Sequence, residues 1–240
     1  MRVIDAFWEK RNLGVETVEI NIDINDKIED IKKAIEEVKA EYVVVKVPAG
    51  YIDAMFLLND MGYKNMETII HATHNLKNIE LEGIQKRIND SVSYEPMNDD
   101  DIEELFQEIK KGLFTTDRIY LDPYFTKEQA SNRYIGWIKD ELSRGTEAFK
   151  LIYKDKSIGF FMFKETEKDV YYPFLAGVYE DYRSTGLGFT FNYKPICEAI
   201  KRNGKMISTF ISSNNNNTVR MHSIFGFQFN KMDYVYIKHN

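Results

Sequence analysis

The feature that most constrains the fold is a short glycine-containing segment, Arg183–Gly188 (RSTGLG), between an expected strand and an expected helix. The strand covers Val170–Tyr179, and the helix runs from the second glycine to about Asn203. Two glycines let the backbone approach a ligand closely, and amide N–H groups at the start of a helix attract anionic oxygens. With the positive charge of Arg183 beside them, this segment predicts a site for a pyrophosphate on an α/β scaffold.

Two common phosphate-binding sequences do not fit this segment. A Rossmann loop needs a third glycine in frame after Gly186-Leu187-Gly188, and a P-loop needs Gly-Lys followed by Ser or Thr. The sequence contains neither at this point. The pattern R-x-x-G-x-G is weak when it stands alone, so a plain Arg–Gly turn without a ligand remains the alternative.

The spacing of apolar residues predicts two units of mixed helix and strand. The polar segment Asn75–Asn89 separates them. We therefore predict a small N-terminal α/β domain over residues 1–85 and a second domain over residues 86–240. In the first unit the expected strands are Glu16–Ile22, Tyr42–Val47 and Thr68–His74, and the expected helices are 26–39 and 51–61.

The second unit has the expected order strand, helix, helix, three strands, helix, strand, helix, strand. One pattern occurs in both units, because Ala54–Tyr63 and Thr218–Phe227 each end in a glycine and an aromatic residue before a strand. This similarity indicates either a stop signal used twice or a degenerate duplication. The expected strands are Val92–Glu95, Ala148–Tyr153, Ile158–Lys164, Val170–Tyr179, Met206–Ser212 and Phe227–Lys238, and the expected helices are about 98–111, 127–143, 188–203 and 218–225.

Charge and composition exclude several classes of protein. The net charge of −6 argues against a broad surface for nucleic acid. The single cysteine, Cys197, excludes a disulfide framework and a Cys-x-x-Cys site, so we expect no metal. The first residues include acidic side chains and no apolar run, and no segment approaches the ~20 apolar residues that span a bilayer. We expect a cytoplasmic protein that neither binds nucleic acid nor inserts into a membrane.

The segment Val178–Gly188 resembles, position by position, the acetyl-CoA signature of the GNAT superfamily of N-acetyltransferases, V-x-P-x-x-[RQ]-x-x-G-x-[GA]. Glu180 departs from this pattern at the proline. Downstream, Asn215 and Gly226-Phe227 resemble the closing motif of the superfamily, which is an asparagine, a helix and then Gly-Phe. The resemblance implies an α/β (α+β) GNAT fold, in which helices flank a mixed, mostly antiparallel central sheet, and it implies acetyl-CoA as the co-substrate.

The resemblance also implies which residues hold acetyl-CoA. The end of the expected strand would be splayed from its neighbour, so that free backbone groups bind the pantetheine arm and one amide faces the thioester oxygen. The glycine segment would bind the pyrophosphate, and Asn215 would bond the pantetheine or position a water. The implied residues are Gly177, Val178 and Tyr179 in the strand, and Arg183, Ser184, Thr185, Gly186, Leu187 and Gly188 in the loop.

His222 occupies the position at which many members of the superfamily carry the tyrosine that protonates the departing CoA thiolate. An imidazole with a pKa near ~6.5 would give its proton downhill to a thiol near ~8.5. The alternative is a packed histidine that leaves the thiolate to water, with Tyr179 and Tyr182 as other candidate acids. No spacing identifies a general base among Glu95, Asp169 and Glu180.

Residues 114–145 combine aromatic side chains with arginine, and in GNAT folds this region lines the acceptor side. We expect Arg118 to clamp a phosphate, and Tyr120 and Tyr134 to stack on a sugar or base. The alternative for Tyr134 is a core position, because it shares one helix face with Trp137 and Ile138.

The whole chain loosely resembles the TDP-fucosamine acetyltransferase type, through Phe7–Val15 (F-W-E-x-x-N-L-G-V), a D-R-I-Y loop at 117–120 and a Y-x-x-W-I helix at 134–138. This resemblance implies direct acetyl transfer, in a ternary complex, to the 4-amino group of a nucleotide-linked deoxysugar. The alternatives are another amine, such as a polyamine, a drug or a peptide N-terminus, or a silent CoA-binding sensor. The closing strand, 227–238, is a candidate for pairing across a homodimer.

Overall fold

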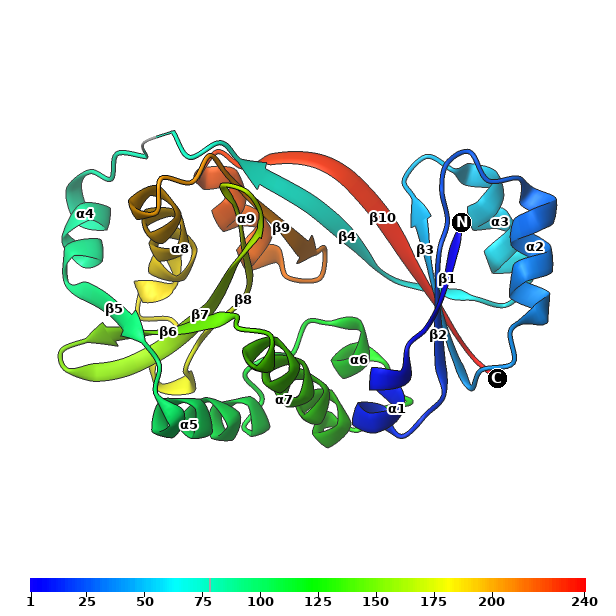
Figure 1. The fold of residues 1–240 in the computed structure, drawn as a ribbon, viewed down its shortest axis with the longest axis horizontal. Helices are drawn as coiled ribbons and strands as arrows, with labels where there is room; N and C mark the ends of the chain where they lie inside the picture. The colour runs from blue at the N-terminus through cyan, green and yellow to red at the C-terminus, as the bar shows by residue number, and fades with distance from the viewer. Residues whose placement is uncertain (78) are drawn as a thin grey trace.

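A computed structural model describes residues 1–77 and 79–240 (Figure 1). Within those residues ten strands form one sheet, in the order β1-β2-β3-β10-β4-β9-β8-β7-β6-β5. Neighbouring strands are antiparallel except for the pairs β2–β3 and β8–β9. The predicted mixed, mostly antiparallel sheet is therefore confirmed. The strands are β1 (Arg2–Asp5), β2 (Thr17–Asn21), β3 (Tyr42–Pro48), β4 (Lys64–His74), β5 (Val92–Pro96), β6 (Glu147–Tyr153), β7 (Lys156–Glu167), β8 (Val170–Val178), β9 (Met206–Ser212) and β10 (Gln228–His239).

Alternate residues of β7 show that helices cover both faces of the C-terminal half of the sheet. Phe161 and Phe163 are buried in one cluster with α8, whereas Phe160 and Met162 are buried in another with α5 and α7. Successive side chains of a strand point to opposite faces, so the run is apolar throughout because both faces are covered. The helices are α1 (Phe7–Leu13), α2 (Ile28–Glu37), α3 (Ile52–Asp60), α4 (Gly83–Asp90), α5 (Asp99–Lys110), α6 (Arg118–Leu121), α7 (Lys127–Ser143), α8 (Thr190–Lys201) and α9 (Asn216–Ile224).

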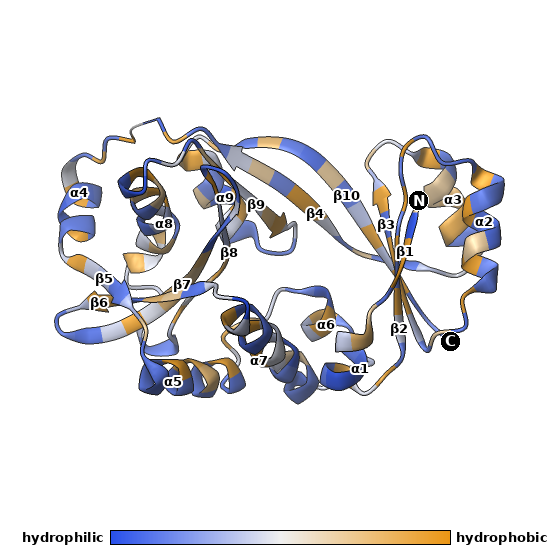
Figure 2. Ribbon diagram, viewed as in Figure 1, coloured by the Kyte–Doolittle hydropathy of each residue, from blue (hydrophilic) through white to orange (hydrophobic). Residues whose placement is uncertain are grey.

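The N-terminal part of the sheet has its own core under α2 and α3. The apolar residues of these helices recur at intervals of four, and they pack on alternate valines of β3. Each fully buried side chain of this size contributes about 1.5–3 kcal/mol relative to an exposed one. Figure 2 shows the polar and apolar residues as alternating bands along β4 and β10. The main members of this core are Ile31, Ile35, Val43, Val45, Val47, Ala54, Leu58 and Tyr236.

β10 lies in the middle of the sheet although it follows every other strand in the sequence. Residues 233–239 pair with Tyr42–Pro48 of β3, and residues 228–237 pair with 64–73 of β4. Residues 233–237 are paired on both edges, which leaves no free edge there for a second copy, and the homodimer stays a prediction. The sheet also runs without a break across the predicted boundary at residues 85 and 86. The division into two domains stays a prediction, and Asn78, inside the predicted boundary segment, lies outside the described residues.

Two parts of the chain share one arrangement. The N-terminal repeat consists of β2-α2-β3-α3-β4, and the C-terminal repeat consists of β8-α8-β9-α9-β10. In each, the last helix is followed by a left-handed glycine, Gly62 at φ 80° and Gly226 at φ 78°, and then by the last strand. These last strands are exchanged, since β4 pairs with β9 and β10 pairs with β3. The similar segments Ala54–Tyr63 and Thr218–Phe227 therefore lie at equivalent places in the fold.

Four elements were absent from the prediction: β1, α1, α4 and α6. α4 has only two apolar residues, Ile84 and Ile88, in a polar segment, which is too weak a pattern to mark a helix. α6 contains only four residues and α1 only seven, which is too short for helical periodicity to stand out. Their positions are fixed by tertiary contacts.

Candidate active site

β8 and β9 open a gap in the sheet. Their parallel pairing is limited to Val170 with Met206 and Tyr171 with Ile207. Beyond these pairs, a side-chain hydrogen bond connects the two strands: Thr209 Oγ1 of β9 donates to the Pro173 carbonyl of β8 at 3.0 Å. On the other side of β8, the register with β7 shifts at the same level, between Met162 and Phe163. The splay predicted for this strand is present.

The phase of the β7–β8 ladder decides which backbone groups face the gap. The Tyr179 amide donates to the Ile158 carbonyl at 2.9 Å, so it points towards β7. Because antiparallel strands alternate the direction of their backbone groups, Val178 and Ala176 point the other way, towards β9. Gly177 pairs with Phe160. Gly177, Val178 and Tyr179 were predicted as backbone ligands, and Ala176 was not, because the phase of a ladder cannot be read from one strand.

The loop after β8 presents unused amides. Ser184 has φ 63° and Gly186 has φ 82°, and alternation with left-handed residues turns successive N–H groups to one side. Within the described part of the chain, the amides of residues 184–186 donate to no backbone carbonyl or side chain. A Cβ added at Gly188 would meet no atom within 4 Å, which leaves space beside these amides.

Side chains of the same loop hold it in place. Leu187 is 5% exposed and belongs to the core under α8. Thr190 Oγ1 donates to the Leu187 carbonyl at 2.7 Å, and Thr185 Oγ1 donates to the Tyr182 carbonyl at 2.6 Å. The Arg183 guanidinium donates to the carbonyls of Gly112 and Leu113 at 3.2 and 3.0 Å, and lies 2.6 Å from Glu180. Arg183 thus ties the loop to the segment that follows α5.

Asn215 lies where β9 turns into α9. Its side-chain oxygen accepts a hydrogen bond from the Thr218 amide at 3.1 Å, so it caps the helix. Its own amide donates to the Ser212 carbonyl at 3.0 Å. The side-chain nitrogen remains to bind a ligand or a water near the end of β9.

His222 is buried in α9. Its Nδ1 lies 2.9 Å from the Thr218 carbonyl, and its ring centroid lies 4.3 Å from that of Phe227. A carbonyl only accepts, so Nδ1 carries the proton and Nε2 is an acceptor. Burial lowers the pKa of His222 to about 4, and the imidazole is therefore neutral at pH 7. This environment does not favour the predicted role as the acid.

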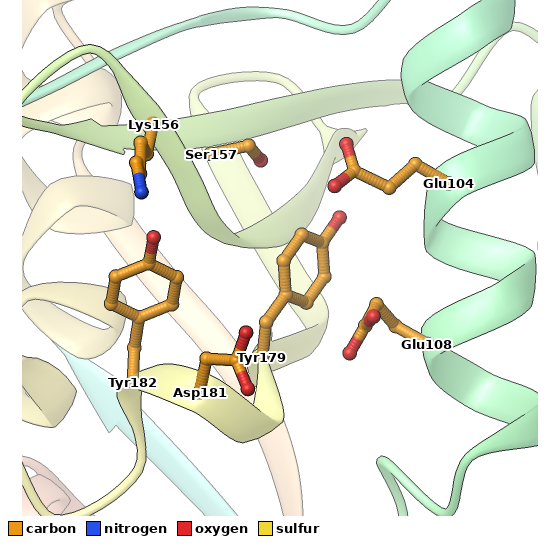
Figure 3. Close-up of a pocket in the computed structure, with 7 residues that line it drawn as sticks. All are labelled: Glu104, Glu108, Lys156, Ser157, Tyr179, Asp181 and Tyr182. Atoms are coloured by element: carbon orange, nitrogen blue, oxygen red, sulfur yellow. The ribbon is translucent and has the colours of Figure 1, made fainter.

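Tyr179 points away from the gap, into a cavity of about 300 Å³ between β7 and α5 (Figure 3). The residue is 4% exposed, and its hydroxyl has no hydrogen-bond partner among the described residues. Burial, with Glu104 nearby, raises the pKa of Tyr179. Tyr182 lines the same cavity. Both phenols therefore line the cavity beside α5.

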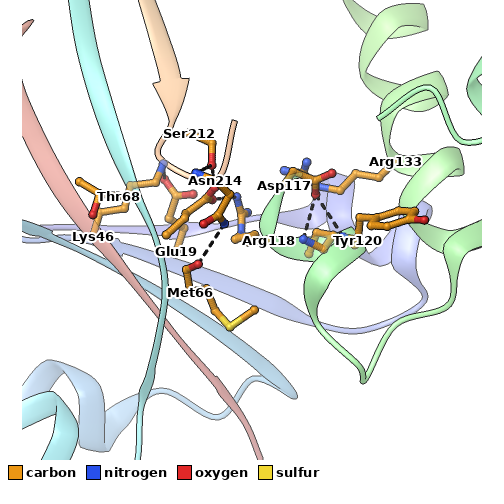
Figure 4. Close-up of polar contacts among 12 residues, drawn as sticks. Glu19, Lys46, Met66, Thr68, Asp117, Arg118, Tyr120, Arg133, Ser212 and Asn214 are labelled. Atoms are coloured by element: carbon orange, nitrogen blue, oxygen red, sulfur yellow. Dashed lines mark hydrogen bonds and ion pairs between the residues drawn. The ribbon is translucent and has the colours of Figure 1, made fainter. Parts of the chain in front are cut away.

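Arg118 lies at the start of α6 among carboxylates (Figure 4). Its terminal nitrogens are 3.7 Å from Glu9 and 3.9 Å from Glu67, and its side chain is 12% exposed. Glu9 also binds Arg133, at 2.8 and 3.0 Å. The charge of Arg118 is thus balanced from within the chain, which makes it a poor clamp for a phosphate.

The two predicted acceptor tyrosines have different surroundings. Tyr134 is buried and stacks on Phe114 at 4.3 Å, which matches the core alternative for this residue. Tyr120 is half-buried, and the ammonium of Lys127 lies 5.7 Å from its ring centroid. The structure therefore does not gather Arg118, Tyr120 and Tyr134 into one open aromatic surface.

A buried carboxylate near the gap was missed from the sequence. Glu67 of β4 is 4% exposed and accepts a hydrogen bond from Ser212 Oγ at 2.6 Å. It belongs to no motif, and only the pairing of β4 with β9 brings it to Ser212. Asn214 follows in the same turn and donates to the Met66 carbonyl at 3.1 Å.

Residues 1–77 and 79–240 hold no group of three His, Cys, Asp or Glu side chains arranged for a metal ion. In the same residues, no helix combines the length and the apolar character needed to cross a membrane.

Comparison with known proteins identifies the fold. No protein-family model matches the sequence, and no curated protein matches it. Among solved structures, a conserved protein of unknown function from Staphylococcus epidermidis has a TM-score of 0.60 at 12% identity, over 94% of this chain and 85% of that one. A GCN5-related N-acetyltransferase from Sphaerobacter thermophilus has a TM-score of 0.58 at 14% identity, over 88% of this chain.

This chain spans only 64% of the length of the Sphaerobacter protein. A tandem GNAT protein from the clavulanic acid biosynthesis pathway has a TM-score of 0.57 at 10% identity, over 92% of this chain and 74% of that one. At such identities the similarity concerns the fold. The chain has the GNAT fold that was predicted from its sequence.

Proposed function

We propose that this chain is an N-acetyltransferase that moves the acetyl group of acetyl-CoA to a primary amine. The observation that carries the proposal is the succession of two features in one stretch of chain. The β8–β9 gap exposes backbone groups of Ala176 and Val178, and the free amides of residues 184–186 follow within ten residues. Two solved proteins with the same fold are named as an N-acetyltransferase and a GNAT protein, which supports the same chemistry here.

Three parts of the described chain could bind acetyl-CoA: the loop after β8, the end of β8, and the side chain of Asn215. Amides of the loop can donate to the pyrophosphate, with room beside Gly188 for its oxygens. Backbone groups of Ala176 and Val178 can bond the amides of the pantetheine arm, as a neighbouring strand would. The side-chain nitrogen of Asn215 can donate to the same arm or to a water.

The thiolate that leaves needs a proton from a source other than the predicted one. His222 is neutral at pH 7, and its Nδ1 proton is directed to the Thr218 carbonyl. We therefore assign the proton to the attacking amine or to water. A CoA-binding protein without activity remains the alternative, and the loss of the expected acid is the observation that favours it.

The nucleotide-linked amino sugar predicted from the sequence stays a proposal for the acceptor. Its phosphates would need a cation that the protein has not already paired. Arg118 instead shares its charge with Glu9 and Glu67, and Lys46 lies 2.8 Å from Glu19 on the neighbouring strands. These contacts favour a cationic amine without phosphate as the acceptor, such as a polyamine.

Release of the CoA thiol tests the proposal. Purified protein is incubated with acetyl-CoA and a panel of polyamines, amino sugars, nucleotide-linked amino sugars and peptides, and binding of acetyl-CoA is measured separately by calorimetry. We expect binding and turnover on at least one amine. Binding without turnover on any amine would support the silent sensor, and no binding at all would contradict the proposed function.

Gly188→Ala provides a matched variant for this assay. The φ of Gly188 is not in the left-handed region, and a Cβ there meets no atom of the protein, so the variant should fold as the wild type does. The added methyl group would occupy the space proposed for the pyrophosphate. We expect weaker acetyl-CoA binding at an unchanged Tm, and equal binding would remove the loop from the site.

A further inference from the structure

We propose that Ser212 and Glu67 form the proton-accepting part of the amine site, and that the acceptor enters it as a primary alkylammonium ion. Ser212 would contact the amine, and Glu67 would act through Ser212 as a positioning residue. This inference rests on the proposed acetyl transfer and names a site and a class of acceptor that the motifs do not reveal.

The two side chains meet across the β4–β9 pair. Ser212 is the register partner of Ile69, two residues from Glu67 on the same strand, so these side chains share one face of the sheet. Ser212 Oγ donates to Glu67 Oε2 at 2.6 Å. Ser212 Oγ also accepts a hydrogen bond from the Asn214 amide at 3.2 Å. One lone pair of Ser212 Oγ is left for an N–H donor.

The position of Ser212 along β9 places it at the open gap. The parallel pairs Val170–Met206 and Tyr171–Ile207 give the offset between β8 and β9, and the contact of Thr209 with Pro173 keeps it. We continue this offset along both strands and allow for the one extra residue that β8 contains at its register shift. Ala176 then lies opposite residues 211–212. Ser212 therefore lies across the gap from a backbone amide that we assign to acetyl-CoA.

Glu67 has no cation within hydrogen-bond distance among the described residues. Arg118 of α6 is its ion-pair partner at 3.9 Å, and Glu67 shares this cation with Glu9 of α1, at 3.7 Å. Glu9 in turn has Arg133 at 2.8 Å. The other ionisable groups around Arg118 and Glu67 are the phenols of Tyr42 from β3 and Tyr134 from α7, Asp117 before α6, and the Lys46–Glu19 pair from β3 and β2.

A buried carboxylate of this kind favours a cationic ligand and accepts its proton. The ammonium donates to Ser212 Oγ, one proton passes through the hydroxyl to Glu67, and the nitrogen becomes a free amine. That nitrogen then bonds to the thioester carbonyl carbon, and the carbon–sulfur bond breaks. The second proton of the nitrogen goes to the CoA thiolate, and Glu67 returns its proton to water after the amide leaves.

The test compares Glu67→Gln and Ser212→Ala with Ser208→Ala as the matched control. Ser208 lies on the same strand and bonds to His71 of β4 at 2.8 Å, so its loss removes a similar hydrogen bond away from the proposed site. We expect Glu67→Gln to lower kcat/KM by about 100-fold to 10,000-fold, which is the range for general-base catalysis. Ser208→Ala should retain wild-type kcat/KM, and all three variants should bind acetyl-CoA as the wild type does.

The pH dependence separates a proton acceptor from a merely structural residue. Without Glu67 as the proton acceptor, the reaction depends on amine that is already deprotonated in water. The deprotonated fraction of the amine rises about tenfold per pH unit below an amine pKa near ~10.4. The defect of Glu67→Gln should therefore shrink as pH rises. A defect of the same size at every pH, or unchanged kcat/KM in Ser212→Ala and Glu67→Gln, would overturn the inference while acetyl transfer by the wild type stands. If Glu67→Gln does not fold, Ser212→Ala carries the test.

Discussion

The N-terminal and C-terminal repeats use the same order of elements, but only one of them is open. In the N-terminal repeat, β2 and β3 pair along five residues, from Thr17 with Tyr42 to Asn21 with Lys46. In the C-terminal repeat, the equivalent strands β8 and β9 pair at two residues and then separate. Paired backbone groups have no capacity left for a ligand, so the difference lies in hydrogen bonds that one repeat makes and the other leaves unmade.

The loops that follow the first strand of each repeat differ in the same way. After β2, Asp26 Oδ2 accepts from the Asp23 amide at 2.6 Å, and Asp23 Oδ1 accepts from the Asn25 amide at 3.0 Å. The carboxylates of this loop occupy its amides and would repel phosphate. After β8, the amides of residues 184–186 have no such partner within the described chain. One scaffold thus yields one loop whose amides are paired and one whose amides are free, and we propose the second as the anion site.

The largest effect should come from the core that the repeats share. Leu58 of α3 is fully buried, and Leu58→Ala should lower the free energy of unfolding by about 2–5 kcal/mol. Because β10 of the C-terminal repeat lies in the N-terminal sheet, we expect one transition, seen equally by circular dichroism and by tryptophan fluorescence. Phe56→Ala, on the exposed side of the same helix at 63% exposure, is the control and should change little. Two separate transitions, with one shifted, would show that the repeats unfold independently.

The next effect concerns the two loops. Gly188→Asp places a carboxylate beside the free amides, and it should weaken acetyl-CoA binding by at least about 100-fold, or about 2.7 kcal/mol. Asn25→Asp adds the same charge to the loop of the N-terminal repeat, where Asn25 is exposed, and should leave binding unchanged. Calorimetric titration of both variants gives the comparison. An equal loss in the two would mean that net charge, and not the loop after β8, governs binding.

The smallest effect concerns the buried histidine of α9. The pKa of His222 is lowered from 6.5 to about 4, so the unfolded chain binds more protons in this range. The neutral histidine therefore contributes stability that is present above about pH 6.5 and is lost as the pH falls towards 4. Between about pH 7 and 5.5 the loss should be on the order of 1 kcal/mol.

Chemical denaturation at several pH values measures this loss, and His222→Gln should show a smaller one. His74 is also buried with a lowered pKa and would keep part of the slope. Equal slopes in the wild type and His222→Gln would contradict a neutral, buried His222. Turnover that falls as His222 loses its proton in the wild type would instead restore its predicted role as the acid.

Local patterns predicted much of the fold and the position of the loop. Tyr42–Val47 is a continuous β-branched run, and it forms the buried strand β3. Gly186 carries the left-handed φ that the turn needs, and Leu187 anchors it. Each of these depends on residues close together in the sequence, which is why periodicity and glycine spacing were sufficient.

The remaining features depend on pairing between distant strands. The free groups of Ala176 follow from the phase of the β7–β8 ladder, and Glu67 reaches Ser212 only because β4 pairs with β9. The arginine of the D-R-I-Y loop was predicted as a phosphate clamp because its carboxylate partners, Glu9 and Glu67, lie 109 and 51 residues away in the sequence. No local pattern contains these contacts.

The place of β10 has a consequence for the order in which the chain can fold during synthesis. β3 and β4 leave the ribosome long before β10. Until β10 arrives β3 has one edge with unpaired backbone groups, and β4 has two such edges until β9 is made. Such edges readily pair with strands of other molecules. The nascent chain must therefore carry an unfinished sheet for about 150 residues, from β4 to β10, so its exposure to aggregation is set by the rate of translation.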